Sequence, residues 1–327
     1  MQQNNQAPLL AMRGTNPGAE SQQRIGSCLS LFDLSQQQIK QVLTLAHGMK
    51  ADPQSYSKCL QGKSIALLFE KPSLRTRVSF DVGIHQLGGH AVYLDAKQVG
   101  PGSRETVTDI ANNLACWTQA IVSRVYAHDT LVQLDKARVP VINALCDQHH
   151  PCQTLADLLT LQELFGEDLS QLKLAYVGDG NNVCQSLMVG AAALNINMTV
   201  YCPQNFAPES AFMQQLHSAY PNHGISIEHD IDEVQALDVI YTDTWISMGE
   251  DEAKSAAKKQ SLLPFQVNHA LLEKSGAQAV MHCLPAHRDE EINSDLLDEQ
   301  LNVVLRQAEN RMHAQKALLA LILNEDA

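Results

Sequence analysis

The segment FEKPSLRTRVSF (residues 69–80) places two arginines in what reads as the first turn of a helix. Cations at that position oppose the helix dipole, so a purely structural role for both is unfavourable. Backbone N–H groups at a helix start are free to bind an anion. Ser73 and Thr76 add hydroxyl donors, and Arg75 adds a planar fork that suits phosphate or carboxylate. The turn therefore predicts a site for a small phosphorylated molecule.

Further polar side chains follow other apolar segments that read as strands. In parallel α/β sheets, ligands bind beyond the carboxyl ends of the strands, so these side chains are candidates for the same site. Arg124 ends one such segment, and it favours anion binding over the simpler interpretation of a capped helix with two surface arginines. Neither a GxxxxGK[ST] phosphate loop nor a GxGxxG fingerprint occurs. The other polar strand ends are residues 149–153, 179–182, 243–249 and 283–285.

Strand-like and helix-like patterns alternate along the chain from about Leu29. This alternation predicts parallel sheets that are covered by helices on both faces. We therefore expect an α/β fold of two doubly wound parallel-sheet domains, with an active-site cleft between them. The expected strands are 64–69, 90–94, 120–125, 139–145, 172–180, 197–203, 236–243 and 277–285. The expected helices are one that ends at Gly88 and Gly89, followed by 105–117, 154–166, 182–194, 208–220 and 307–323.

The composition limits the partners of this chain of 327 residues. The formal net charge is −13, whereas nucleic acids and anionic membranes both favour a basic surface. No apolar run approaches the roughly 20 residues that span a bilayer, and no signal-peptide core is evident. The eight cysteines form no C-x-x-C pair and the histidines lack ligand spacing, so we expect no metal and no cofactor. These features predict a cytoplasmic protein without nucleic-acid or membrane partners.

Five segments at consistent spacing carry most of the candidate residues: PSLRTR, HPCQTLADLLT, DTWISMG, MHCLPAHR and AENRMHAQ. They resemble motifs of the carbamoyltransferase family, and most closely those of its ornithine-specific members. The resemblance covers nearly everything after residue 28. It implies transfer of the carbamoyl group of carbamoyl phosphate to the δ-amine of L-ornithine, which gives L-citrulline and phosphate in arginine biosynthesis.

The resemblance also implies a role for each matching residue. The implied catalytic residues are Arg75, His150, Cys283 and Arg311. The implied carbamoyl phosphate site comprises Ser73, Leu74, Arg75, Thr76, Gln98, Arg124, His150, Gln153, Cys283, Leu284 and Arg311. The implied ornithine site comprises Asn182, Asp243, Ser247 and Met248.

Three of these roles concern the carbonyl group and the assembly. His150, Thr76 and Arg311 are implied to polarise the carbonyl oxygen, and Gln153 to hold the carbamoyl amide. Gln98 is implied to reach the site of a neighbouring subunit, so we expect a homo-oligomer and, as in the family, a trimer. The implied donors agree with the chemistry, because amine attack on a carbamoyl carbon builds negative charge on the carbonyl oxygen.

The expected domain organisation follows from the alternation and the resemblance together. Residues 1–27 form a polar N-terminal tail. Residues 28–149 form the carbamoyl phosphate-binding domain, and residues 150–306 form the ornithine-binding domain. Residues 307–327 form a C-terminal helix that returns to the first domain.

Leu74 departs from the family pattern, which usually has threonine there. Leucine resembles the enzymes that act on N-acetyl- or N-succinyl-ornithine, which remain an alternative. The complete DTWISMG and HCLPAHR segments favour free ornithine, because Asp243 can pair with a free α-ammonium group. A regulatory protein that only binds a phosphorylated metabolite is a second alternative. The set of cationic and amide groups counts against it, since a sensor needs no donors aimed at a developing oxyanion.

Overall fold

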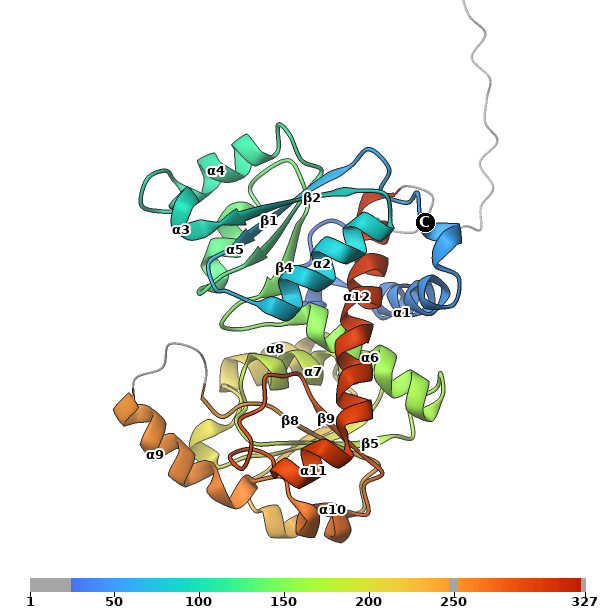
Figure 1. Cartoon of the computed structure of the whole chain (residues 1–327). Coiled ribbons are helices and arrows are strands. Elements are labelled where there is room, and N and C mark those ends of the chain that lie inside the picture. Colours follow the sequence, from blue (N-terminus) through green and yellow to red (C-terminus); the bar gives the residue numbers. More distant parts are fainter. Residues whose placement is uncertain (1–24, 247–251, 325–327) are drawn as a thin grey trace, which may run out of the picture.

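The computed structural model describes residues 25–246 and 252–324, apart from the side chains of Gln98 and residues 252–254. Two parallel sheets dominate this part of the chain (Figure 1), with strand orders β2-β1-β3-β4 and β7-β6-β5-β8-β9. The first sheet comprises β1 (Ser64–Phe69), β2 (His90–Asp95), β3 (Ala120–Arg124) and β4 (Val141–Leu145). The second comprises β5 (Lys173–Val177), β6 (Asn197–Tyr201), β7 (Ile225–Glu228), β8 (Val239–Thr242) and β9 (Ala279–His282).

Helices connect the strands and cover both faces of each sheet (Figure 1). This arrangement confirms the expected class of two doubly wound α/β domains. The helices of the first half are α1 (Gln36–Ala51), α2 (Leu74–Gln86), α3 (Ala96–Val99), α4 (Val107–Leu114) and α5 (His128–Leu134). Those that follow are α6 (Pro151–Phe165), α7 (Asn182–Ala193), α8 (Ser210–Ala219), α9 (Glu252–Leu262), α10 (His269–Ser275), α11 (Ser294–Glu299) and α12 (Leu301–Leu323).

Alternate side chains of the central strands enter different cores, as the two-residue period of a strand requires. In β1, Ala66 and Leu68 pack in a core with Ile110 of α4 and Leu131 of α5. Their neighbours on the opposite face belong to the largest core, which also contains residues of α1, α2, α6, α7 and α12. Because this core includes side chains from both sheets, the two domains are packed together rather than joined by a free linker.

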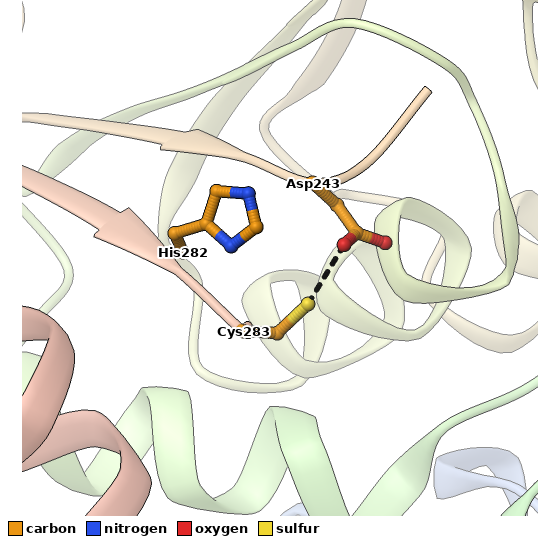
Figure 2. Close-up of side chains that lie close together, drawn as sticks. All are labelled: Asp243, His282 and Cys283. Carbon is orange, nitrogen blue, oxygen red and sulfur yellow. Dashed lines mark hydrogen bonds between the residues drawn. The ribbon is translucent and has the colours of Figure 1, made fainter. Parts of the chain in front are cut away.

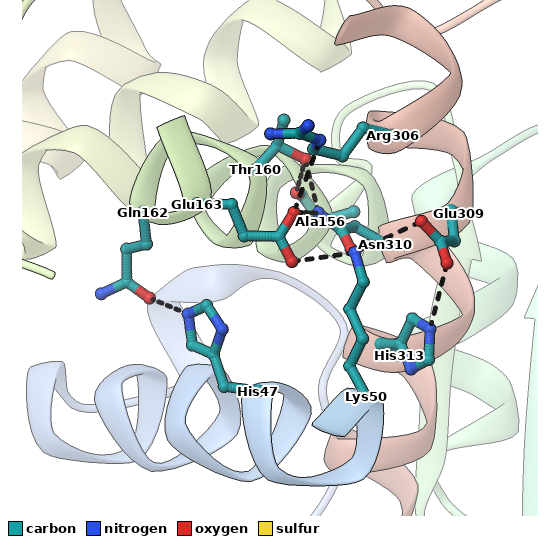
Figure 3. Close-up of polar contacts among 10 residues, drawn as sticks. All are labelled: His47, Lys50, Ala156, Thr160, Gln162, Glu163, Arg306, Glu309, Asn310 and His313. Carbon is teal, nitrogen blue, oxygen red and sulfur yellow. Dashed lines mark hydrogen bonds and ion pairs between the residues drawn. The ribbon is translucent and has the colours of Figure 1, made fainter. Parts of the chain in front are cut away.

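Helix α12 starts beside the second sheet and runs back to the first domain (Figure 1), where it packs on α1 and α2 as well as on α6. A polar cluster fixes α1, α6 and α12 to one another (Figure 3). Lys50 of α1 donates to Glu163 of α6 and to Asn310 of α12, both at 2.8 Å. Asn310 in turn donates to Thr160 of α6 at 3.0 Å. The expected return of the C-terminal helix to the first domain is therefore confirmed.

Several elements were not predicted from the sequence, and several boundaries differ, the largest difference being at the start of the last helix. The last helix was expected from residue 307 but begins at Leu301, directly after α11 and Gln300. Strand β7 has only half-exposed or exposed side chains, so its apolar pattern is weak. Helix α1 was missed although Ser35 and Gln38 form a capping box at its start. Helices α5, α10 and α11 are short, at 7, 7 and 6 residues. Within the described ranges, no helix is both long and apolar enough to cross a membrane.

Candidate active site

The turn that follows β1 is built as a helix start. Ser73 is the N-cap of α2, and its hydroxyl accepts from the Thr76 backbone N–H at 3.3 Å. The same hydroxyl donates to Thr76 Oγ1 at 3.0 Å. Phe69, the last residue of β1, pairs in register with Arg124 at the end of β3. The parallel pairing therefore brings the arginine of one strand end to the helix start that follows its neighbour.

Two buried arginines converge on Thr76. Arg311 Nη2 donates to Thr76 Oγ1 at 2.8 Å, and Arg124 Nη1 donates to the same atom at 3.4 Å. Burial, with the charges of Arg311 and Arg75, lowers the pKa of Arg124 to about 10, so the side chain stays charged at neutral pH. Nε of Arg124 and Nε of Arg311 have no hydrogen-bond partner among the described residues. Buried cations this close together create strong attraction for an anion.

The start of α6 contributes an imidazole and an amide beside these arginines. The backbone N–H of His150 donates to Ser186 Oγ at 2.7 Å, and Pro151 occupies the first helical turn. Arg311 Nη1 donates to Gln153 Oε1 at 2.8 Å and lies 3.5 Å from His150 Nε2. Burial, then the charges of Arg311 and Arg124, holds the pKa of His150 well below its usual range. His150 is therefore a neutral imidazole at neutral pH.

The ends of β8 and β9 supply the facing wall (Figure 2). The Cys283 thiol donates to Asp243 Oδ1 at 2.9 Å, and Asn181 Nδ2 donates to Asp243 Oδ2 at 3.0 Å. Burial and the neighbouring Asp243 carboxylate raise the pKa of Cys283 well above its usual value. Cys283 is therefore a thiol that orients the carboxylate, and not a thiolate nucleophile.

Asp243, His282 and Cys283 also lie close enough for their ligand atoms to suggest a metal (Figure 2). However, His282 Nδ1 accepts from the Leu284 backbone N–H at 2.9 Å, and His282 Nε2 is 3.0 Å from Glu291 Oε1. Both ring nitrogens are thus used to shape the loop after β9. The cluster is explained by hydrogen bonds within the protein.

The side chains at the start of α2, at the start of α6 and at the ends of β8 and β9 line a cavity of about 500 Å³ between the two domains. Its lining combines the end of the first sheet and α2 with the ends of β8 and β9. Thr76 lies buried directly beneath the lining and is reached through Arg124 and Arg311. The expected site residues that line this cavity are Ser73, Leu74, Arg75, Arg124, His150, Gln153, Asn182, Asp243, Cys283, Leu284 and Arg311.

Some expected residues lie elsewhere or outside the described part. Ser247 and Met248 fall outside the described residues, and Gln98 is described only by its backbone, in α3. Asn182 Nδ2 donates to the Cys146 carbonyl at 2.7 Å, so its amide also ties α7 to the end of β4. Leu74 is 76% exposed at the mouth of the cavity. Its side chain offers no polar group there, so only its backbone N–H can contact an anion.

Several supporting residues were given no specific role from the sequence. Lys71 lines the cavity, and Asn181 holds Asp243 while it caps α7 through Oδ1. Asp157 and Gln307 form a buried pair behind Gln153. Lys71 and Asn181 stand next to expected site residues, which was an available signal. Asp157 lies within HPCQTLADLLT and Gln307 directly precedes AENRMHAQ, but inside these helices no local pattern separates them from ordinary polar positions.

A cleft between two parallel sheets, with buried cations and a helix start on one wall and a carboxylate on the other, defines a two-domain enzyme that binds an anionic substrate. Residues 27–163 match the family model described as the carbamoyl-P binding domain of aspartate/ornithine carbamoyltransferase. Residues 170–322 match the model for the Asp/Orn binding domain of the same family. The chain belongs to the aspartate/ornithine carbamoyltransferase family.

Individual relatives agree with this assignment. The chain is 52% identical over 300 residues to the ornithine carbamoyltransferase of Shewanella oneidensis, an alignment that covers 90% of this chain and 99% of the relative. The crystal structure of ornithine carbamoyltransferase from Thermus thermophilus aligns with a TM-score of 0.81 and 39% identity, over 91% of this chain and 99% of the other. Ornithine carbamoyltransferase from Pyrococcus furiosus aligns with a TM-score of 0.86 and 41% identity, over 92% and 97%.

Proposed function

We propose that this protein transfers the carbamoyl group of carbamoyl phosphate to the δ-amine of L-ornithine, releasing L-citrulline and phosphate. One observation carries the proposal: the buried guanidinium of Arg311 contacts Thr76, Gln153 and His150 on one side of a cavity whose other side presents Asp243. The cationic side suits a phosphorylated carbonyl compound, and the carboxylate suits an ammonium group.

The phosphate is bound at the start of α2. The backbone N–H groups of that turn, including those of Leu74 and Thr76, point at the anion together with the hydroxyl of Ser73. Arg75 and Arg124 supply the compensating charge. The arginines in this turn and beside it repel one another, and a dianion bound among them attracts each of them.

The carbonyl oxygen is bound deeper, by Arg311, Thr76 and neutral His150. Their hydrogen bonds strengthen as negative charge builds on this oxygen during attack, so the transition state gains more than the ground state. Gln153 accepts a hydrogen bond from the carbamoyl amide and orients the group. The dissociating phosphate takes the proton that the attacking amine loses, which removes the need for a dedicated protein base.

The ornithine is bound by the second domain. The Asp243 carboxylate pairs with the α-ammonium group, and Asn182, Ser247 and Met248 complete the contacts to the amino-acid end. Cys283 and Leu284 lie beside the δ-amine at the end of β9. The hydrogen bonds from Cys283 and Asn181 hold the Asp243 carboxylate in place for this pairing.

A citrulline assay tests the substrate directly. Carbamoyl phosphate should give a carbamoylated product with L-ornithine, and the rate with N-acetyl- or N-succinyl-ornithine should be far lower. Product from the acylated amines alone would overturn the substrate assignment. Carbamoyl phosphate binding without turnover of any of these amines would instead support the regulatory binder.

The same proposal includes the finer assignments. The protein is a cytoplasmic homotrimer that serves arginine biosynthesis, and Gln98 reaches the site of a neighbouring subunit. Its two domains comprise residues 28–149 and 150–306. The exposed apolar side chains of Leu74, Val78 and Val82 lie at four-residue spacing on α2, which supports a subunit contact. The eight cysteines are all unpaired, which suits a reducing compartment. Sedimentation checks the assembly, since a fully active monomer contradicts a shared site.

A further inference from the structure

Asp157 is a buried carboxylate behind the cavity, on α6 one turn after Gln153, with 0% of its surface exposed. Its Oδ1 accepts two hydrogen bonds from side-chain amides. Gln153 Nε2 donates at 2.8 Å, and Gln307 Nε2 of α12 donates at 2.6 Å. Asp157 does not line the cavity and contacts no group expected to react. Tyr241 also hydrogen-bonds its carboxyl group, so any contribution of Asp157 to the site passes through the groups that hold it, of which only Gln153 lines the cavity.

Oδ1 of Asp157 imposes one orientation on each amide, because an oxygen that accepts two hydrogen bonds has no hydrogen of its own to donate to them. Both glutamines must therefore turn their NH2 groups towards Asp157. The oxygen of Gln307 accordingly accepts from the His282 backbone N–H at 3.1 Å. The oxygen of Gln153 accordingly faces Arg311, from which it accepts at 2.8 Å. The two ends of a glutamine amide are nearly equal in shape, so these hydrogen bonds alone distinguish them.

The position is unfavourable for a carboxylate in other respects. Burial raises the pKa of Asp157 to about 7, although the hydrogen bonds with Gln153, Gln307 and Tyr241 and the charge of Arg311 act in the opposite direction. Oδ2 has no hydrogen-bond partner among the described residues. Buried charges are a poor source of stability, and apolar replacements of similar volume often stabilise a protein. A role in orienting the site explains a residue whose contribution to folding alone is weak.

We propose that Asp157 is a positioning residue that holds the Gln153 amide with its oxygen towards the carbamoyl group. This orientation selects a phosphorylated donor whose carbonyl carbon carries an NH2 group over a donor whose carbonyl carbon carries a methyl group. The proposal rests on the proposed function. In that reaction Arg311 has donors for both the substrate carbonyl and the Gln153 oxygen, and Asp157 keeps the NH2 end of Gln153 fixed. A methyl group on the donor cannot donate a hydrogen bond to the Gln153 oxygen, whereas an NH2 group can.

Phosphonoacetamide and 2-oxopropylphosphonate test this selection, because they differ only in an NH2 group against a methyl group and contain no scissile phosphate ester. Titration calorimetry gives the dissociation constant of each. The protein should bind the amide about tenfold more tightly than the ketone. Equal affinities for the two compounds in the unchanged protein would overturn the role given to Gln153 and Asp157. Failure to bind either compound would count against the proposed function itself.

Variants of Asp157 then assign the selection to this residue. The affinity ratio is the affinity for phosphonoacetamide divided by the affinity for 2-oxopropylphosphonate. In Asp157→Leu, which keeps the approximate shape of the side chain, this ratio should fall by about tenfold, to near one. In Asp157→Asn, whose amide can donate as well as accept, the ratio should fall by about threefold. Thr160→Val is the matched control, because Thr160 is buried about one turn further along α6. Its hydroxyl accepts a hydrogen bond from Asn310 and makes none with Gln153. Its ratio should equal that of the unchanged protein.

The affinity ratio distinguishes a lost orientation of the Gln153 amide from a general structural defect, because a purely structural defect weakens the binding of both compounds equally. An unaltered ratio in folded Asp157→Leu overturns the proposal. Should Asp157→Leu fail to fold, an unaltered ratio in Asp157→Asn overturns it in the same way. A fall of the ratio in Thr160→Val as large as in the Asp157 variants also overturns it.

Discussion

Arg311 donates to the hydroxyl of Thr76 at 2.8 Å, although 235 positions separate the two residues. This hydrogen bond joins the C-terminal helix α12 to the first turn of α2, in the wall of a cavity between two parallel sheets. The guanidinium also contacts Gln153 at the start of α6. Three helix segments thus meet at one cation, and its removal is the most direct test of the site.

Arg311→Met should lower kcat/KM for carbamoyl transfer by about 10²- to 10³-fold, because it removes a donor to the developing oxyanion. Steady-state assays of citrulline formation measure the loss. Arg306→Met is the matched control on the same helix, since Arg306 is partly exposed and only approaches Glu163 at 4.0 Å. Its activity should stay within about twofold of the original. A comparable loss in both variants would mean that α12 acts through its packing alone.

Arg75→Met should weaken the binding of carbamoyl phosphate by about tenfold or more, because it removes a charge-assisted contact at the start of α2. Arg77→Met provides the comparison, since the Arg77 guanidinium lies 3.7 Å from the centre of the Tyr93 ring and does not line the cavity. Calorimetric titration with phosphonoacetamide measures both. Weakening in Arg77→Met alone would contradict the position given to the phosphate.

Asp243→Asn should raise the KM for ornithine by at least about tenfold and leave the KM for carbamoyl phosphate nearly unchanged, because it removes the carboxylate that the proposed function pairs with the α-ammonium group. Asp232→Asn, in the same domain but exposed and paired with Lys274, should alter neither constant. Measuring both constants at saturating second substrate separates the effects. Equal increases for the two substrates would refute the ornithine assignment.

His313→Gln should make the protein less sensitive to acid. Burial, then the charges of Lys316 and Lys50, lowers the pKa of His313 to about 4. The unfolded chain binds a proton near pH 6.5, so the stabilisation is present above that pH and is lost as the pH falls towards 4. Between pH 7 and pH 5 the unchanged protein should lose about 2 kcal/mol of unfolding free energy through this residue.

Urea unfolding at fixed protein concentration measures this loss at both pH values. His269→Gln is the control, because His269 is about half exposed and lies 3.9 Å from an exposed glutamate. The pH dependence of its unfolding should match that of the unchanged protein. An identical pH dependence in His313→Gln would show that His313 is already protonated in the folded state.

The sequence predicted the part of the site that depends on strand ends. Ser73, Arg124, His150 and Asp243 each end or follow a strand or precede the next helix, and parallel pairing forces such positions together. Asp157 and Gln307 escaped notice because they lie within helices, and their meeting depends on how α6 packs against α12. Arg311 was found only through its family motif, since nothing local marks a helix residue that reaches a distant turn.

The elements were predicted on similar grounds. Central strands such as β1 and β3 are apolar on both faces and stand out in the sequence. The edge strand β7, with Ser226 and Glu228 exposed, does not. The start of α12 was placed too late because α11 and α12 are separated only by Gln300, which leaves no loop signal between them.

The position of α12 also bears on the order of events during protein synthesis. Both sheets precede Arg311 in the chain, so they leave the ribosome before it does. Chains generally fold from the N-terminal domain onward as they emerge. A nascent chain can therefore fold both sheets and still lack the cation that joins Thr76 to Gln153. Catalytic competence should appear only when α12 docks, after the translation of both domains is complete.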